Sequence, residues 1–149
     1  VPDPVLNANK TNDMYVAGEF ALPGNDVIYT ISVSNSGAGA TDANSIVLID
    51  EMPGEISFYN GDIDDGGPET DPVSFSQTNG TSLTWNYNTD VGFWNGPTKP
   101  SSFAGCSYTP LPVGGYDSSV SYICFNPKGV LSSNDPDHQF AVQFRARIN

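Results

Sequence analysis

Apolar and polar residues alternate along several short stretches of this chain, most clearly in "HQFAVQFRARIN" near its end. One face of this segment carries Phe140, Val142, Phe144, Ala146 and Ile148, and the other carries Gln139, Gln143, Arg145 and Arg147. A period of two residues is typical of a β-strand with one buried face. The pattern predicts a strand here, with the phenylalanines in the core and both arginines facing outward.

A second stretch, "VIYTISVSN", alternates in the same way, and its inward face carries Val27, Tyr29, Ile31 and Val33. Shorter strands are predicted between clusters of Gly, Pro, Asn and Asp, which favour turns. These shorter predicted strands are 5–10, 45–53, 55–60, 73–77, 82–88 and 120–126.

About eight strands and no helical apolar stripe indicate an all-β fold, most simply an antiparallel β-sandwich. The 149 residues fit a single domain, 1–149, that is large enough to bury a core. We expect a long irregular insertion near residues 88–119, which are rich in Gly, Pro and Ser. Residues 1–11 are a candidate N-terminal extension or exchanged strand.

The charge is one-sided, with 17 acidic against 5 basic residues and a net charge of -12. Nucleic acid would be repelled by such a surface, so no nucleic-acid partner is expected. No run of 18 apolar residues occurs, so no transmembrane segment is expected.

Because the chain begins at Val1, we expect a mature extracellular or cell-surface protein after removal of a signal peptide, although a trimmed chain would begin in the same way.

Cys106 and Cys124 are the two cysteines of the chain. An even pair in an acidic, turn-rich chain favours a disulfide and an oxidising compartment. The alternative is two buried free thiols.

The segment from Pro23 to Asp62 resembles a bacterial and archaeal surface module known as domain of unknown function eleven. The resemblance is carried by Pro23, Gly24, Asp26, Val27, Tyr29, Ile31, Val33, Asn35 and Gly37, then by Val47, Ile49 or Asp50, and Pro53. Asn25 is inserted, Met52 replaces the usual Leu, and residues 88–135 have no counterpart. The resemblance implies an immunoglobulin-like sandwich with an extracellular structural or adhesive role.

The stretch "NGDIDDGGPETDP" concentrates five carboxylates, and two interpretations of it stay open. Repulsion among the carboxylates would be relieved by a cation, so Asp62, Asp64, Asp65, Glu69 and Asp71 are candidate calcium ligands. An EF-hand is excluded because Val73 stands at its twelfth position. The alternative is a solvated turn that holds no cofactor.

Catalysis is not expected from this sequence. A glycosidase needs two carboxylates held on rigid elements, whereas these carboxylates lie in a Gly-rich loop. The single histidine, His138, lacks a Gly-x-Ser-x-Gly partner motif, so a serine hydrolase is also disfavoured.

Aromatic residues and sequons suggest a further class of function. Trp94, Phe93 and Tyr108 are candidate ligand-binding residues for surface glycans. The alternative is that Trp85 fills the core and that Phe93 or Trp94 caps it beside the disulfide. Asn9 and Asn79 begin glycosylation sequons, which arise by chance in a chain rich in Asn, Ser and Thr.

Taken together, these patterns predict a non-catalytic extracellular structural protein. We expect a homopolymer such as a surface filament, pilus-like fibre or surface layer, in which subunits are joined by strand complementation. The alternative is a secreted adhesive or carbohydrate-binding sandwich.

Overall fold

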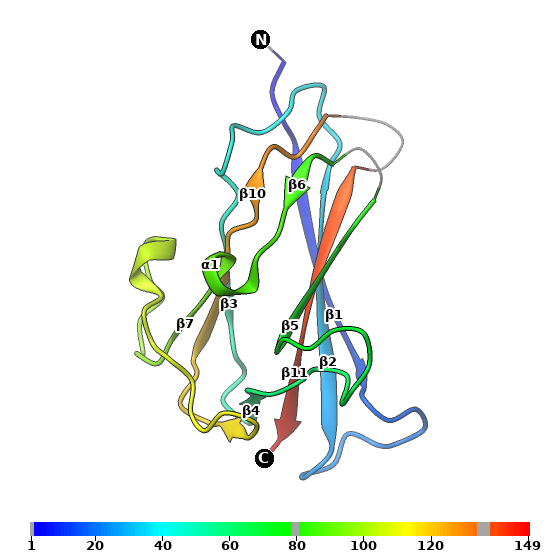
Figure 1. Cartoon of the computed structure of the whole chain (residues 1–149), viewed down its shortest axis with the longest axis vertical. Coiled ribbons are helices and arrows are strands. Elements are labelled where there is room, and N and C mark those ends of the chain that lie inside the picture. Colours follow the sequence, from blue (N-terminus) through cyan, green and yellow to red (C-terminus); the bar gives the residue numbers. More distant parts are fainter. Residues whose placement is uncertain (1, 79–80, 134–137) are drawn as a thin grey trace.

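The computed structural model describes residues 2–78, 81–133 and 138–149, which form an elongated two-layer β-structure with the chain ends at opposite poles (Figure 1). Its helical segments are the single-turn helix α1 (Tyr87–Asp90) and a 3₁₀ turn (Phe103–Gly105). Its strands are β1 (Leu6–Met14), β2 (Asp26–Asn35), β3 (Leu48–Glu51), β4 (Ile56–Tyr59), β5 (Val73–Gln77), β6 (Leu83–Thr84), β7 (Val91–Trp94), β8 (Tyr116–Asp117), β9 (Tyr122–Phe125), β10 (Lys128–Gly129) and β11 (Gln139–Ile148).

The larger sheet is built around β2 and β11, the two strands with the clearest alternation. They pair antiparallel from Gln139 opposite Ser34 to Arg147 opposite Asp26. The strand order is β1-β2-β11-β4-β8, and β5 pairs with β11 beside β4. The last strand of the chain therefore lies beside β2 at the centre of this sheet, and β1 lies at its edge.

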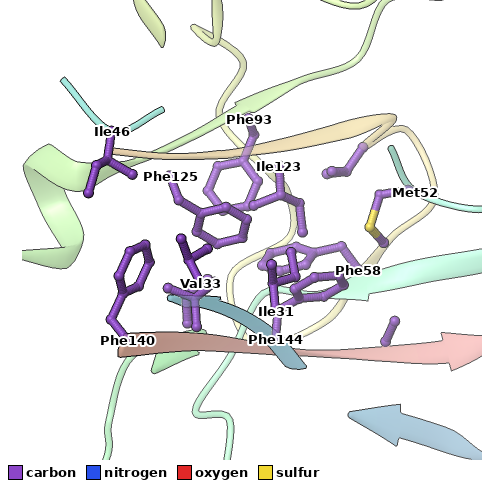
Figure 2. Close-up of a cluster of buried hydrophobic side chains, with 14 of the residues drawn as sticks. Ile31, Val33, Ile46, Met52, Phe58, Phe93, Ile123, Phe125, Phe140 and Phe144 are labelled. Carbon is purple, nitrogen blue, oxygen red and sulfur yellow. The ribbon is translucent and has the colours of Figure 1, made fainter. Parts of the chain in front are cut away.

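The smaller sheet, in the order β3-β9-β7, covers the inner face of the larger one, and β6 and β10 form a separate two-stranded ladder. Phenylalanines from both sheets point toward one another between the layers (Figure 2). Phe58 and Phe93 approach to 4.9 Å between ring centroids, and Phe144 stacks on Tyr29 at 5.2 Å. The predicted all-β sandwich is confirmed, and Phe140, Val142, Phe144 and Ala146 lie in its core as expected.

The predicted irregular insertion at 88–119 is partly wrong, because it contains β7, which is an edge strand of the smaller sheet. Phe93 pairs with Ile123 of β9 on one side and forms an isolated bridge with Tyr108 on the other. The predicted strand 82–88 is shorter than expected, since Asn86 caps α1 by accepting a hydrogen bond from the Asn88 N–H. Short strands such as these offer too few residues for an alternation to be visible.

The predicted disulfide between Cys106 and Cys124 is present and buried. It ties the loop after the 3₁₀ turn to the central strand of the smaller sheet. In the chain-entropy account, a bridge that closes a loop of this length stabilises the fold by about 3 kcal/mol.

Strand β1 extends beyond the predicted 5–10, because it pairs with β2 along nine residues from Leu6 opposite Asn35 to Met14 opposite Val27. Its residues are exposed from Leu6 to Asp13, and Met14 is partly covered. Lys10 is the β1 residue with a polar contact to the smaller sheet among the described residues, through Asp50 and Glu51 of β3, so this strand is held mainly by its backbone ladder. An exposed connector, residues 15–25, leads from β1 to β2.

Candidate functional site

The acidic stretch folds into a loop whose carboxylates bind their own backbone. Asp62 accepts hydrogen bonds from the Gly66 N–H at 2.8 Å and from the Asp64 N–H at 3.2 Å. Asp64 accepts from the Glu69 N–H at 3.2 Å, and Glu69 accepts from the Thr70 and Asp71 N–H groups. Asp65 and Gly66 have positive φ, which closes the turn. The side-chain carboxylates thus accept hydrogen bonds from backbone N–H groups that, in a strand, would be bonded to a neighbouring strand.

The loop is fastened to the larger sheet through Arg145. Asp65 Oδ2 lies 2.8 Å from Arg145 Nη1 and accepts a hydrogen bond from the Tyr15 hydroxyl at 2.9 Å. The hydrogen bond from Arg145 is the main reason why the pKa of Asp65 is lowered, and the Tyr15 hydroxyl adds to it. A loop rich in negative charge is thus held to the sheet by one of the five basic residues of the chain.

Arg145 is buried on the outer face of β11, beneath that loop. Its guanidinium lies 3.7 Å from the Tyr15 ring centroid and 4.4 Å from that of Tyr59, and its Nε donates to Asp26. Burial lowers the pKa of Arg145, but the hydrogen bonds and charges of Asp65 and Asp26 outweigh it and raise the pKa further. Arg145 therefore stays a cation, with its Nε and Nη1 paired with carboxylates and its guanidinium packed near two aromatic rings, which suits a structural clamp.

Tyr116 completes this polar cluster at the end of the sheet. Its hydroxyl donates to Asp26 Oδ2 at 2.6 Å, and the Arg147 guanidinium lies 3.9 Å from its ring centroid. Burial, followed by the hydrogen bond to Asp26, raises the pKa of Tyr116 to about 12. This cluster was not predicted from the sequence, in which its one signal is the pair of arginines on the outward face of a strand in a chain poor in basic residues.

The candidate calcium ligands are spread along the loop rather than gathered at a point. Among residues 2–78, 81–133 and 138–149, no three His, Cys, Asp or Glu side chains are arranged to hold a metal ion. Burial and the charge of Glu69 raise the pKa of Asp71. The hydrogen bonds inside the loop favour the turn interpretation, and calcium binding stays a prediction.

A hollow of about 720 Å³ lies on the outer face of the larger sheet, between β1, β2, β11 and the acidic loop. Its floor is a row of polar side chains that runs across four strands, because Thr11 faces Thr30, Thr30 faces Gln143, and Gln143 faces Ser74. Gln143 Nε2 donates to Thr30 Oγ1 at 2.9 Å. The residues that line the hollow are Thr11, Asn12, Asp13, Met14, Tyr15, Ile28, Thr30, Ile63, Asp64, Glu69, Ser74 and Gln143.

The aromatic residues proposed for glycan binding do not form one exposed platform. Phe93 is in the core, where its ring packs on Phe58, so its candidate role as a stacking surface is not supported by its position. Trp94 is half-buried over Gly96, and Tyr108 donates its hydroxyl to Asp117 at 2.8 Å. The positions of Phe93, in the core, and of Trp85, packed against it, favour the alternative over a glycan platform.

Asn9 and His138 are not among the residues that line the hollow. Asn9 is exposed on β1, where it is accessible to modification, and Asn79 lies outside the described residues. His138 has its Nδ1 2.8 Å from the Ser133 carbonyl oxygen.

Comparisons of the chain with protein families, with curated proteins and with solved structures found no match. Among the described residues, no helix is long and apolar enough to cross a membrane. Function must therefore be argued from the strands and surfaces themselves.

Proposed function

We propose that this chain is a non-catalytic, extracellular structural protein that self-associates into a filament, with β1 passing from one subunit to the next. The observation that carries the proposal is the character of β1. It pairs with β2 along nine residues, yet eight of these residues are exposed. A strand held mainly through its backbone can be supplied equally well by another copy of the chain.

The side chains of β1 add few contacts to the rest of the fold. Lys10 Nζ lies 2.8 Å from Asp50 Oδ2 of β3 and 4.9 Å from the Tyr29 ring centroid, and Met14 packs at the edge of the core. A neighbour's β1 would make the same contacts in the same register. The contacts of β1 therefore have the same energy within one subunit and between two subunits. The main cost of exchanging β1 is the entropy that is lost when subunits associate.

The connector between β1 and β2 is suited to exchange. Antiparallel neighbours can be joined by a two-residue turn, whereas residues 15–25 would span roughly 35 Å when extended. Its Val16, Phe20 and Leu22 side chains are 50%, 76% and 56% exposed. These side chains leave apolar surface on the connector that a neighbouring subunit could cover.

The disulfide and the acidic composition support an extracellular location, where disulfides persist. The resemblance of the segment from Pro23 to Asp62 to a surface module supports the same location. Because an exchange that does not close on itself generates an open chain of subunits, the expected product is a fibre.

The test is negative-stain electron microscopy of native material, combined with light scattering of the purified chain. We expect filaments, and a scattering mass that rises with protein concentration. Native material that contains only monomers across the concentration range would refute the proposal.

A further inference from the structure

The hollow on the outer face of the larger sheet has the composition of a polyol site. Its floor presents hydroxyl and amide groups in one row, from Thr11 through Thr30 and Gln143 to Ser74. Ile28 and Ile63 add apolar surface beside this row. A few convergent polar groups next to apolar patches, in a volume of about 720 Å³, are typical of small-molecule sites.

The hydrogen-bonding capacity of the floor is only partly used. Gln143 donates to Thr30 Oγ1 at 2.9 Å, and the Ser74 hydroxyl lies 3.5 Å from Gln143 Oε1. A hydroxyl both donates and accepts, so Thr11, Thr30 and Ser74 retain groups that can meet the hydroxyls of a ligand. Neighbouring strands hold these groups roughly 4.8 Å apart, so the row can meet hydroxyls at non-adjacent positions of a sugar ring or on successive rings.

The negative charge of the residues that line the hollow affects which sugars can bind there. The carboxylates of Asp13, Asp64 and Glu69 line the hollow, and none of its lining residues is basic. Asp64 Oδ1 is covered and has no hydrogen-bond partner. An acidic sugar would be repelled from these walls, whereas an amine would be attracted.

We propose that this hollow binds a saccharide without acidic groups, and that sugars bearing a free amine bind best. This inference goes beyond the proposed filament and does not depend on it. The hollow is completed by Thr11 and Asp13 of β1 whether that strand comes from the same chain or from a neighbour. Filaments that bear such sites along their length would bind amino-sugar polymers at many points.

The test is a titration of the folded chain with oligomers of glucosamine, of N-acetylglucosamine and of galacturonic acid, followed by amide NMR shifts near physiological salt. We expect affinity to fall in that order, with shifts confined to residues around Thr11, Asp13, Thr30 and Gln143. Binding of galacturonate as tight as that of glucosamine, shifts at another surface, or no binding of any oligomer at millimolar concentration would overturn the proposal.

Variants separate the hydroxyl row from the carboxylates. Thr30→Val keeps the shape of a strand residue and removes one hydroxyl, so we expect both the glucosamine and the N-acetylglucosamine oligomers to bind about fivefold more weakly. Asp13→Asn should reduce the preference for the amine and leave binding of the N-acetyl oligomer unchanged. Ser32→Ala, on the same face of β2 but outside the hollow, is the matched control. Unchanged binding by both Thr30→Val and Asp13→Asn would refute the assignment even if a sugar binds.

Discussion

Arg145 Nη1 lies 2.8 Å from Asp65 Oδ2, and this contact joins the last strand of the sheet to the acidic loop. The two residues are far apart in the sequence. Asp65 belongs to the acidic loop, which carries five carboxylates within ten residues. The same guanidinium reaches Asp26 and is stacked between Tyr15 and Tyr59. The buried guanidinium of Arg145 thus holds the acidic loop against the sheet and offsets part of the repulsion among the carboxylates of the loop.

Replacing Arg145 with Met should therefore destabilise the fold by about 3 kcal/mol, because the buried carboxylate of Asp26 would lose its cationic partner and keep only the Tyr116 hydroxyl. Urea unfolding of Arg145→Met and of Arg147→Met measures the difference. Arg147 contacts the Tyr116 ring from a less buried position, so its loss should cost less. Equal free energies of unfolding for the two variants would contradict the assigned role of Arg145.

The alternation in the last strand predicted correctly that Arg145 faces away from the core, but not that it is buried. A period of two residues reports which face a side chain occupies and carries no information about what covers that face. The cover is the loop that contains Asp65, which local pattern cannot place over the strand. For the same reason the hollow beside Thr30 and Gln143 could not be predicted, since its walls come from segments that meet only in the folded chain.

The strands β1 and β7 were predicted too short or not at all, because neither shows a clear alternation of apolar and polar residues, and the reason differs between them. Thr11–Met14 of β1 is mostly polar because an exposed edge strand needs only backbone pairing. β7 contains Gly92, where a Cβ would meet the backbone and side chain of Cys106. Only glycine fits at this position, so β7 has no side chain there to show the alternation of a strand. The long strands β2 and β11, with one buried face each, were the most predictable part of the fold.

Acid should weaken the fold partly through Asp117. Burial raises the pKa of Asp117, but hydrogen bonds from the Leu111 N–H, the Tyr108 hydroxyl and the Ser119 N–H outweigh it and lower the pKa below 3.8. A carboxyl with a lowered pKa in the folded state stabilises that state above its unfolded pKa. This contribution is lost as the pH falls through the folded pKa.

The free-energy gap between the wild-type chain and Asp117→Asn should accordingly be largest near neutral pH and narrow below about pH 4. Urea unfolding at a series of pH values measures the gap, and Asp3→Asn, at an exposed position, corrects for the loss of one negative charge. A gap that stays constant from neutral pH to pH 3 would show that Asp117 does not contribute in this way.

Removal of divalent cations should leave the melting temperature unchanged, because Asp62, Asp64, Asp65 and Glu69 each already accept a hydrogen bond from a backbone N–H group or from Arg145. Thermal melts in EDTA and in excess calcium test this expectation, with magnesium as the control for ionic strength. A melting temperature that falls in EDTA and recovers with calcium alone would instead support Asp62, Asp64, Asp65, Glu69 and Asp71 as calcium ligands.

The central claim, that β1 passes between subunits, is tested most directly by trapping the strand with a disulfide. Asn9 of β1 faces Ser32 of β2, so Asn9→Cys combined with Ser32→Cys places two thiols in register. Ser34→Cys combined with Gln139→Cys is the matched control, because β2 and β11 should stay within one subunit. After assembly and mild oxidation, we predict a ladder of covalent oligomers on a non-reducing gel for the first pair and monomers for the second. Monomers alone from the Asn9 and Ser32 pair in assembled material would contradict the account.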